Sequence, residues 1–555
     1  MAETNGELVF VPLGGVGEIG MNLALYGWGR AGARKWIIVD VGVTFPGPDL
    51  PGVDLVLPDI RFIEGELKNL AGIVITHAHE DHYGALLDLW PKLKAPVWMT
   101  PFAAGLLEAK RQGEYNAPKV PVTIYRAGET FEVGPFRIEA VAVSHSIPEP
   151  VSLAITTPLG TVIHTGDWKI DPTPPIGPTT DEARFRALGD AGVLALMCDS
   201  TNAMRDGESP SEQAVGAGLR AEIEKAQGRV AVTTFSSNVG RVRSIAEAAR
   251  DAGREVLVLG RSLRRMIDVA GELGYLEGLP AFVPEDEFAS IPRDRLVILC
   301  TGSQGEDRAA LAKLSRDEMR TVSLDAGDTV IFSSRVIPGN ERPILEIKNR
   351  LIDMGVKVVE DGDALVHVSG HPRRSELKRM YEWTRPGVLI PVHGEAAHLV
   401  AQGSLGAMAG IGQVLQVRNG DMVRLAPGPA EIIDQVPFGR VFKDGRVIGS
   451  EEGVGIKDRR KLSFAGHVAV NVVLDERYDL AGDPDLVAIG LPQADAKGVN
   501  LEETLLAAVI SAVTSIPRSR RKDLDLVAEA ARRAVRGAAN DAWGKKPLTT
   551  VFVTY

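Results

Sequence analysis

Residues 76–82 concentrate side chains that can bind metal ions. Their sequence, THAHEDH, contains four metal-competent side chains within six residues: His77, His79, Asp81 and His82. The chain has only ten histidines in 555 residues, so this density is improbable by chance. The apolar, β-branched run 72–75 predicts a buried strand that ends where the histidines begin. We expect a metal site on this strand end; the alternative is a polar surface loop that happens to be rich in histidine.

Three further donors follow other predicted strands. His145 follows the apolar run 140–143, Asp167 ends the sequence HTGD, and His393 follows the run 388–392. A site for two metal ions needs about six to eight donors and activates water near pH 7. We expect two groups joined by a shared carboxylate: His77, His79 and His145 on one ion, Asp81, His82 and His393 on the other, and Asp167 between them.

The weaker candidates have ordinary alternatives. Taken alone, His145 or His393 would more often be a hydrogen-bonded core histidine, but the cluster at 76–82 favours the ligand role. Asp40 ends the apolar run 36–39. It is either a carboxylate that orients a metal ligand or part of a simple turn.

Composition limits the remaining possibilities. At roughly 150 residues per domain, the length predicts three or four domains. The net charge of −11 argues mildly against a large non-specific nucleic-acid surface, but it leaves room for local basic patches. With only Cys198 and Cys300, a disulfide framework is excluded and a reducing, cytoplasmic location is expected. We expect neither a secretory signal nor a membrane span.

The pattern of elements changes along the chain. Strands and Gly/Pro turns dominate up to about residue 199, and from about residue 209 helices alternate with strands, which predicts a parallel sheet flanked by helices. Residues 364–368 and 388–392 again read as short strands. Residues 424–440 read as a connector, and Asp444-Gly445 predicts a hairpin turn. The last hundred residues combine predicted strands (466–474, 486–491, 548–554) with predicted helices (501–514, 523–538).

Together the donor motifs resemble the metallo-β-lactamase superfamily, whose fold is an αββα sandwich with metals at one edge. Within this superfamily the chain resembles the β-CASP nucleases. The resemblance rests on three motif residues: Asp199 in MCDSTN, His371 in SGHP and His393 in PVHGE. The closest overall likeness is to the ribonuclease J family, on the sequences TTFSSN (233–238) and TGSQGE (301–306). It covers nearly the whole chain and weakens after about residue 450.

This resemblance implies an α/β architecture. It predicts a metallo-β-lactamase sandwich with an inserted α/β β-CASP domain and a small α+β C-terminal domain. The expected boundaries are 1–205 and 351–422 for the sandwich, 206–350 for the insert, 423–455 for a linker and 456–555 for the C-terminal domain. RNA would lie in the cleft between sandwich and insert.

The resemblance also implies a metal-dependent ribonuclease acting in rRNA processing and mRNA decay. Two divalent ions per chain, zinc or alternatively manganese, would generate a hydroxide that attacks the phosphodiester and leaves 5′-phosphate products. Cleavage would run mainly 5′ to 3′ from 5′-monophosphate ends of single-stranded RNA, with endonuclease activity in addition. Asp81 and His371 would be catalytic, His371 as stabiliser or proton donor, and Asp199 would orient a neighbouring histidine.

A pocket for the 5′-phosphate is expected where TTFSSN opens a helix at residue 240. Its candidate residues are Ser236, Ser237, Asn238 and Arg241, completed by Ser369 and Gly370 through the resemblance. The alternative is plain helix capping. The glycine-rich segment 14–17 is not expected to bind a dinucleotide, because no helix pattern follows it.

Other functions remain open from the sequence. A single-strand DNA nuclease of the same architecture is the main alternative, and His393 favours RNA by resemblance. A non-catalytic RNA-binding scaffold and a thioester, lactam or lactone hydrolase are weaker alternatives. The C-terminal domain is expected to form a homo-oligomer, dimer or tetramer, and other RNA-decay proteins are expected partners.

Overall fold

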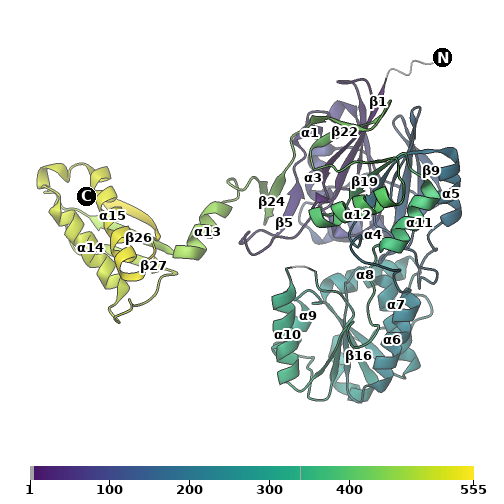
Figure 1. Ribbon diagram of the computed structural model, residues 1–555. Helices are drawn as coiled ribbons and strands as arrows, with labels where there is room; N and C mark the ends of the chain where they lie inside the picture. The colour runs from purple at the N-terminus through teal and green to yellow at the C-terminus, as the bar shows by residue number, and fades with distance from the viewer. Residues whose placement is uncertain (1–5, 338) are drawn as a thin grey trace. The chain divides into compact units, whose positions relative to one another are not determined.

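The computed structural model describes residues 6–337 and 339–555, which form two compact units (Figure 1). The first unit contains the chain up to Thr44 and Leu57–Arg440, and the second contains Phe45–Val56 and Val441–Tyr555. All the predicted metal-binding residues belong to the first unit.

An eight-stranded mixed sheet forms one layer of the first unit. Its order is β23-β22-β1-β3-β4-β6-β7-β8. The strands are β23 (Glu431–Gln435), β22 (Asp421–Ala426), β1 (Glu7–Gly14), β3 (Leu23–Gly29), β4 (Lys35–Val39), β6 (Leu70–Val74), β7 (Val97–Met99) and β8 (Val122–Ile124). Pairing is antiparallel from β23 to β4 and parallel from β4 to β8.

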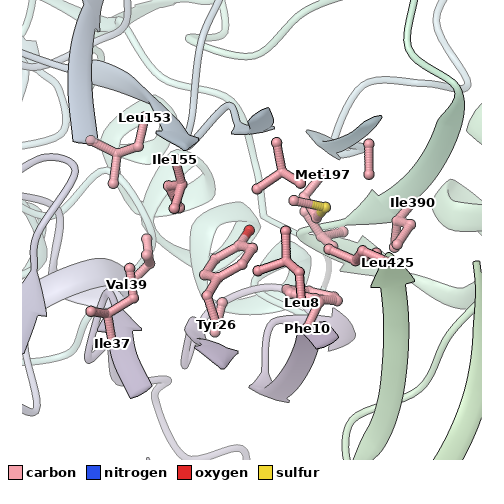
Figure 2. Close-up of a cluster of buried hydrophobic side chains, with 14 of the residues drawn as sticks. Leu8, Phe10, Tyr26, Ile37, Val39, Leu153, Ile155, Met197, Ile390 and Leu425 are labelled. Carbon is pink, nitrogen blue, oxygen red and sulfur yellow. The ribbon is translucent and has the colours of Figure 1, made fainter. Parts of the chain in front are cut away.

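A seven-stranded sheet forms the second layer, in the order β21-β19-β13-β12-β11-β10-β9. The strands are β21 (Gln413–Val414), β19 (Val388–Val392), β13 (Val193–Asp199), β12 (Gly160–His164), β11 (Val151–Thr157), β10 (Phe136–Ala142) and β9 (Thr130–Val133). The inner faces of the two sheets meet in a core that includes Leu8, Ile37, Leu153 and Ile390 (Figure 2). Side chains alternate along each strand, so every second residue contributes to this core.

Helices cover the outer faces of both sheets. On the seven-stranded sheet, buried side chains come from α5 (Glu182–Ala191), α11 (Arg374–Thr384) and α12 (Ala396–Met408). On the other sheet, Trp36 points away from the core and its ring meets Phe62 of α1 (Arg61–Glu64) edge-on, with centroids 5.4 Å apart. Helix α3 (Leu86–Leu93) lies in the connection from β6 to β7, and α4 (Pro101–Gly113) in the connection from β7 to β8. The predicted αββα sandwich is therefore confirmed.

The predicted insert contains a five-stranded parallel sheet, ordered β15-β16-β14-β17-β18. The strands are β14 (Val230–Thr233), β15 (Glu255–Leu259), β16 (Leu296–Cys300), β17 (Thr329–Phe332) and β18 (Lys357–Val359). Helices α6 (Glu212–Lys225), α7 (Val239–Asp251) and α8 (Arg261–Glu272) pack on one face, and α9 (Ala310–Ser315) and α10 (Glu341–Asp353) on the other. The sheet thus continues past residue 350, the predicted end of the insert.

Two segments differ from the expectations. Residues 364–368 do not form a strand, because the Val366 carbonyl accepts bonds from the Ser333 hydroxyl (2.7 Å) and the Arg241 guanidinium (3.3 Å) instead of a neighbouring strand. Residues 421–435, most of them predicted to be linker, form β22 and β23. Val423 and Leu425 alternate into the sandwich core, and this burial draws β22 into the sheet, whereas β23 pairs with β22 as an exposed edge strand.

The second unit contains a small α+β domain. Its sheet has the order β27-β26-β28, with β26 (His467–Val473), β27 (Asp485–Ile489) and β28 (Leu548–Thr554). Val468, Val470 and Val472 face α14 (Leu501–Ser515) and α15 (Leu524–Trp543). Helix α13 (Ile456–Ala465) precedes this sheet, and β24 (Arg440–Asp444) and β25 (Val447–Gly449) form the predicted hairpin, which pairs with β5 (Leu55–Pro58). Among the described helices, none is long and apolar enough to cross a membrane.

Candidate metal centre and active site

The predicted metal-binding residues converge at one edge of the sandwich. Each follows the carboxyl end of a strand: residues 77–82 after β6, His145 after β10, Asp167 after β12 and His393 after β19. These strands belong to both sheets, so residues far apart in the sequence meet at the open edge between the two layers. Short helix α2 (Glu80–Tyr83) begins inside the histidine cluster and places Asp81 and His82 on its first turn.

The side chains form two groups that share Asp167. His77, His79, His145 and Asp167 bring their candidate ligand atoms within 4.8 Å of one another, and so do Asp81, His82, Asp167 and His393. The structure therefore assembles the seven residues in the two sets expected from the sequence. A third group, Asp199, His371 and His393, adjoins the second set.

Hydrogen bonds on the outer nitrogens fix four of the rings. His82 Nδ1 lies 2.7 Å from Asp40 Oδ2, His145 Nδ1 lies 2.7 Å from the Gly370 carbonyl, and His393 Nδ1 lies 3.0 Å from Asn22 Oδ1. His77 Nδ1 lies 3.0 Å from the Thr76 hydroxyl. These bonds aim the four Nε2 atoms inward, as is usual for histidines that bind metal.

Asp40 holds the histidine loop in place. Its Oδ1 accepts from the Thr76 amide and its Oδ2 from the Thr76 hydroxyl, both at 2.8 Å. Oδ2 also meets His82 Nδ1. Asp40 adopts a left-handed backbone with φ of 64°, a conformation that aspartate tolerates better than most residues. Strain at this turn is offset by three bonds that lock the loop.

Burial keeps the first group of histidines neutral. It lowers the pKa of His77 and of His145 well below the usual value, and lowers that of His79 to about 4. Nearby imidazoles lower the pKa of His77 and of His145 further, because a second positive charge is unfavourable there. Neutral imidazoles have the lone pairs that a cation requires.

The carboxylate shared by both groups stays ionised. Burial alone would raise the pKa of Asp167, but His393, His82 and His371 together hold it well below its usual value. Burial likewise disfavours the charged form of His82, and the carboxylates of Asp167, Asp81 and Asp40 outweigh it and raise its pKa.

His371 and Asp199 form a separate pair beside the donors. His371 Nδ1 lies 2.7 Å from Asp199 Oδ2, and its ring centroid lies 5.1 Å from that of His145. Burial would lower the pKa of His371, but Asp199 and Asp167 raise it to about 9. The imidazole can therefore carry a proton at neutral pH, as a donor to a leaving oxygen requires.

The donor set fits divalent cations. His79 Nδ1 lies 3.1 Å from His77 Nε2 and 3.0 Å from His145 Nε2. Nitrogens on a tetrahedral zinc ion, bound at about 2.0–2.1 Å, lie roughly 3.3 Å apart. In addition, Asp167 Oδ1 is buried and accepts no well-aligned hydrogen bond, although His82 Nε2 lies 3.2 Å away. Cations among these atoms would satisfy all of them.

Sequence reasoning missed Asn22, which bonds to His393 and donates to the Asp81 carbonyl at 3.0 Å. The signal was the glycine-rich segment 14–17. A Cβ on Gly14 would lie 1.8 Å from the Met21 carbonyl oxygen, and one on Gly15 would lie 2.1 Å from Asn22 Oδ1. These glycines let the chain pass closely enough to present Asn22 to the site.

The predicted 5′-phosphate residues are placed differently from one another. Asn238 Oδ1 accepts the Arg241 amide at 2.9 Å, so Asn238 caps α7. Arg241 is fully buried, with its guanidinium bound to Glu212 and Ser333. Ser236 and Ser237 lie partly exposed just before the helix. Of the four, only these two are not buried.

Ser369 and Gly370 lie against His371 and His145. The Gly370 carbonyl orients His145, and a Cβ on Gly370 would come within 2.6 Å of His145 Nδ1. The Ser369 hydroxyl lies 3.0 Å from Asn202 Nδ2 and 3.4 Å from the His371 amide. Gly370 is therefore required by close packing, and Ser369 connects His371 to Asn202.

Comparison with protein families agrees with this architecture. Family models match for the metallo-beta-lactamase superfamily (residues 30–261), the ribonuclease J beta-CASP domain (227–351), the Zn-dependent metallo-hydrolase RNA specificity domain (355–412) and the ribonuclease J C-terminal domain (454–555). The fold and the donor set thus define a metallo-β-lactamase-type hydrolase with a β-CASP insert. A solved protein of unknown function from Enterococcus faecalis V583 shares the fold, with a TM-score of 0.51 at 15% identity over 75% of this chain and 100% of that one.

Curated relatives make the assignment specific. Ribonuclease J of Sinorhizobium meliloti is 63% identical over 548 residues, covering 99% of this chain and 97% of the relative. Ribonuclease J of Mycolicibacterium smegmatis is 39% identical, covering 98% and 96%, and that of Helicobacter pylori strain J99 is 35% identical, covering 85% and 68%. The chain belongs to the ribonuclease J family. It is a metal-dependent ribonuclease whose His/Asp clusters bind divalent metal and whose substrate is RNA.

Proposed function

We propose that this chain degrades single-stranded RNA from the 5′ end, starting at a 5′-monophosphate and releasing products that carry 5′-phosphates. Endonucleolytic cleavage is a second activity of the same site. The observation that carries the proposal is the pair of donor groups sharing Asp167, with the His371–Asp199 pair at their side. Such an arrangement suits hydrolysis of a phosphodiester, where charge develops on several oxygens.

Two divalent cations, zinc or manganese, would be held by the two groups, with Asp167 between them. When bound, they supply an activated water and neutralise the phosphoryl oxygens. Asp81 completes the second group and also lies 3.8 Å from His393 Nε2. The neutral imidazoles of His77, His79 and His145 serve the first group without prior loss of a proton.

His371 would donate the proton to the leaving oxygen. Asp199 fixes its Nδ1, which leaves Nε2 to face the substrate. Asp199 itself is held by the Thr201 amide at 2.9 Å and by the Thr165 hydroxyl, which accepts from the Asp199 amide at 3.2 Å. The carboxylate therefore acts as the orienting group for this histidine.

The 5′-phosphate would be bound by Ser236 and Ser237, just before the start of α7. Asn238 caps the helix at this turn, and the ion pair between Arg241 and Glu212 anchors the first turn of α7. By resemblance, Ser369 and Gly370 would complete this phosphate site. A double substitution of Ser236 and Ser237 by Ala is expected to weaken use of monophosphate ends but not internal cleavage.

Self-association is proposed to involve the C-terminal domain. The face of the β27-β26-β28 sheet opposite α14 and α15 carries the exposed side chains Val487, Ile489 and Phe552. A second copy would cover these apolar groups. Sedimentation of the full chain with Ile489→Asp and Phe552→Asp should reveal a smaller species than the unaltered chain forms.

Degradation of a short RNA labelled at its 5′ end tests the proposal. The label would sit on either a monophosphate or a triphosphate end, with Mn²⁺ or Zn²⁺ added and chelator as control. Release of labelled mononucleotide from the monophosphate form alone is expected. Longer labelled fragments from both forms would show that endonuclease action dominates, and cleavage of single-stranded DNA in place of RNA would overturn the proposal.

A further inference from the structure

Three arginines gather around Asn202 beside the active site. Asn202 Nδ2 donates to the Ser369 hydroxyl and to the His371 carbonyl, both at 3.0 Å. Arg335 Nη1 donates to Asn202 Oδ1 at 3.3 Å, and the Arg205 amide donates to the Asn202 carbonyl at 2.9 Å. The Asn202 side chain thus connects His371 to Arg335, and its backbone carbonyl holds the turn that carries Arg205.

The third arginine arrives on the His371 segment. Arg373 lies two residues after His371, and the next amide, that of Arg374, donates to the Arg205 carbonyl at 3.0 Å. Arg205, Arg335 and Arg373, the arginine cluster, therefore come from three segments: the loop after β13, the loop after β17 and the turn before α11. Sandwich and insert both contribute.

The cluster lacks direct carboxylate partners. Within the described residues, no carboxylate lies within 4.0 Å of any of the three guanidinium groups, whereas the adjacent Arg374 pairs with Asp206 at 3.3 Å. Partial desolvation lowers the pKa of Arg335, and Arg205 and Arg373 lower it further, with Asp361 acting in the opposite sense. Burial and Arg373 likewise lower the pKa of Arg205. These charges repel one another in a chain of net charge −11.

The fold holds Arg335 in this position. Gln304, from the TGSQGE sequence, donates from Nε2 to the Arg335 carbonyl at 2.8 Å. Its Oε1 accepts the Ile337 amide at 2.9 Å and Asn340 Nδ2 at 3.3 Å. A buried glutamine therefore fixes both sides of the loop that carries Arg335. A loop so constrained, with like charges facing one another, is suited to an anionic ligand.

We propose that Arg205, Arg335 and Arg373 bind the phosphodiester backbone of the RNA strand next to the metal centre, with Asn202 aligning them to His371. This inference rests on the proposed function. Guanidinium groups match phosphate geometry, and several of them along a strand suit consecutive phosphates more than one small anion. The cluster would position the strand without reading its sequence.

Salt dependence of RNA binding tests this role directly. The full chain would be kept metal-free with chelator so that a short single-stranded RNA binds without cleavage. Each phosphate contact on a single strand contributes about 0.7 to the slope of log affinity against log salt. The triple variant R205Q/R335Q/R373Q should therefore lower the slope by roughly 2, and its affinity at low salt should fall at least tenfold.

Arg342→Gln is the matched control, because Arg342 is 90% exposed on α10 and carries the same charge. It should leave the slope unchanged. An equal slope for the triple variant and the control would overturn the inference while the unaltered chain still binds RNA. No RNA binding by the unaltered chain would instead count against the proposed function. Single-stranded DNA of the same length should show the same change in slope, since its backbone carries the same phosphates.

Folding gives an independent check. Because the three guanidinium groups repel one another, their removal should leave the Tm unchanged or raise it. A fall of several degrees would show that the cluster stabilises the fold, which contradicts a ligand-binding role. The single variant Arg335→Gln keeps the test available if the triple variant does not fold, with an expected decrease in slope of about 0.7.

Discussion

Two polar clusters, an ion cluster and the metal centre, lie within a few residues of each other in the sequence. The charges of the ion cluster are paired, whereas those of the metal centre are not. The ion cluster consists of Lys169, Asp171, Glu212 and Arg241. Lys169 Nζ lies 3.0 Å from Asp171 Oδ2 and 3.4 Å from Glu212 Oε1, and Arg241 Nη2 lies 2.8 Å from Glu212 Oε2. Two cations meet two anions, and every charge has a partner.

The metal centre, only two residues away at Asp167, has no such balance. It gathers seven donors, and Asp167 Oδ1 has no aligned partner. Both clusters contain buried polar groups, so burial of polar groups does not itself reveal a site. What distinguishes them is the surplus of lone pairs in one and the complete pairing in the other. The metal centre needs a cation, whereas the ion cluster joins the sandwich to α6 and α7 of the insert.

The largest expected effect separates activity from folding. Asp81→Ala should reduce RNA hydrolysis by at least about 10³-fold, equivalent to roughly 4 kcal/mol of transition-state stabilisation, because the second donor group loses a ligand. The fold should survive, since Asp81 lies on the loop side of α2 and is partly exposed. Hydrolysis rate, metal content and thermal melting would be measured together. Global unfolding of this variant would show the site to be structural.

Removal of one partner from the ion cluster should have the reverse pattern. Glu212→Gln leaves Arg241 and Lys169 buried with less compensation and should cost about 3–5 kcal/mol in the free energy of unfolding. The measurement is denaturant unfolding. Replacing Glu212 and Arg241 together by Leu and Met should cost less than the sum of the single changes. Additive losses would contradict a paired, structural cluster.

The same cluster predicts sensitivity to acid. Burial would raise the pKa of Glu212, but Arg241 and Lys169 lower it to about 2. Because the folded pKa is below the unfolded value, this stabilisation of about 3 kcal/mol is present above pH 4.5 and is lost as the pH falls toward 2. The free energy of unfolding of the unaltered chain should decrease as the pH falls from 4.5 to 2, and it should decrease less in Glu212→Gln. An equal decrease in both chains would refute the lowered pKa of Glu212.

His371 should give the opposite dependence in the metal-free chain. Its folded pKa of about 9 lies above the ordinary value of 6.5, so its stabilisation is present below pH 6.5 and is lost as the pH rises through 9. The Tm of the metal-free chain should decrease across this pH range, and the Tm of His371→Asn should decrease less. A mutant and an unaltered chain with the same alkaline slope would argue against the protonated pair with Asp199.

Metal binding tests the surplus of donors itself. Ions that bind only the folded chain should stabilise it by about 2.7 kcal/mol at a concentration 100 times the Kd. The Tm should therefore rise with added Zn²⁺ or Mn²⁺ in the unaltered chain and much less in His79→Ala. Arg342→Gln, far from the donors in sequence, should respond as the unaltered chain does. A rise of equal size in His79→Ala would place the metal elsewhere.

The sequence predicted the fold class and the donor set because their signals are local. Strand ends with adjacent histidines, and alternating helices and strands, are visible in windows of about ten residues. Bonds between distant segments were not visible. Asn22 meets His393 across 371 positions, and Arg241 meets Glu212 instead of a phosphate. A basic residue beside a helix start fits both a phosphate ligand and a buried ion pair, and only the packed fold distinguishes them.

The smallest expected effect concerns a second link between sandwich and insert, at the surface. Tyr275 donates its hydroxyl to Glu149 Oε1 at 2.6 Å, and Glu149 Oε2 accepts the Phe102 amide at 2.6 Å. Tyr275→Phe should cost only about 1–2 kcal/mol, because the carboxylate keeps the Phe102 amide and is not fully buried. Denaturant unfolding would be compared with Tyr555→Phe, whose ring is exposed in the second unit. A loss as large as that of Glu212→Gln would mean that this contact holds the two domains together as strongly as the ion cluster does.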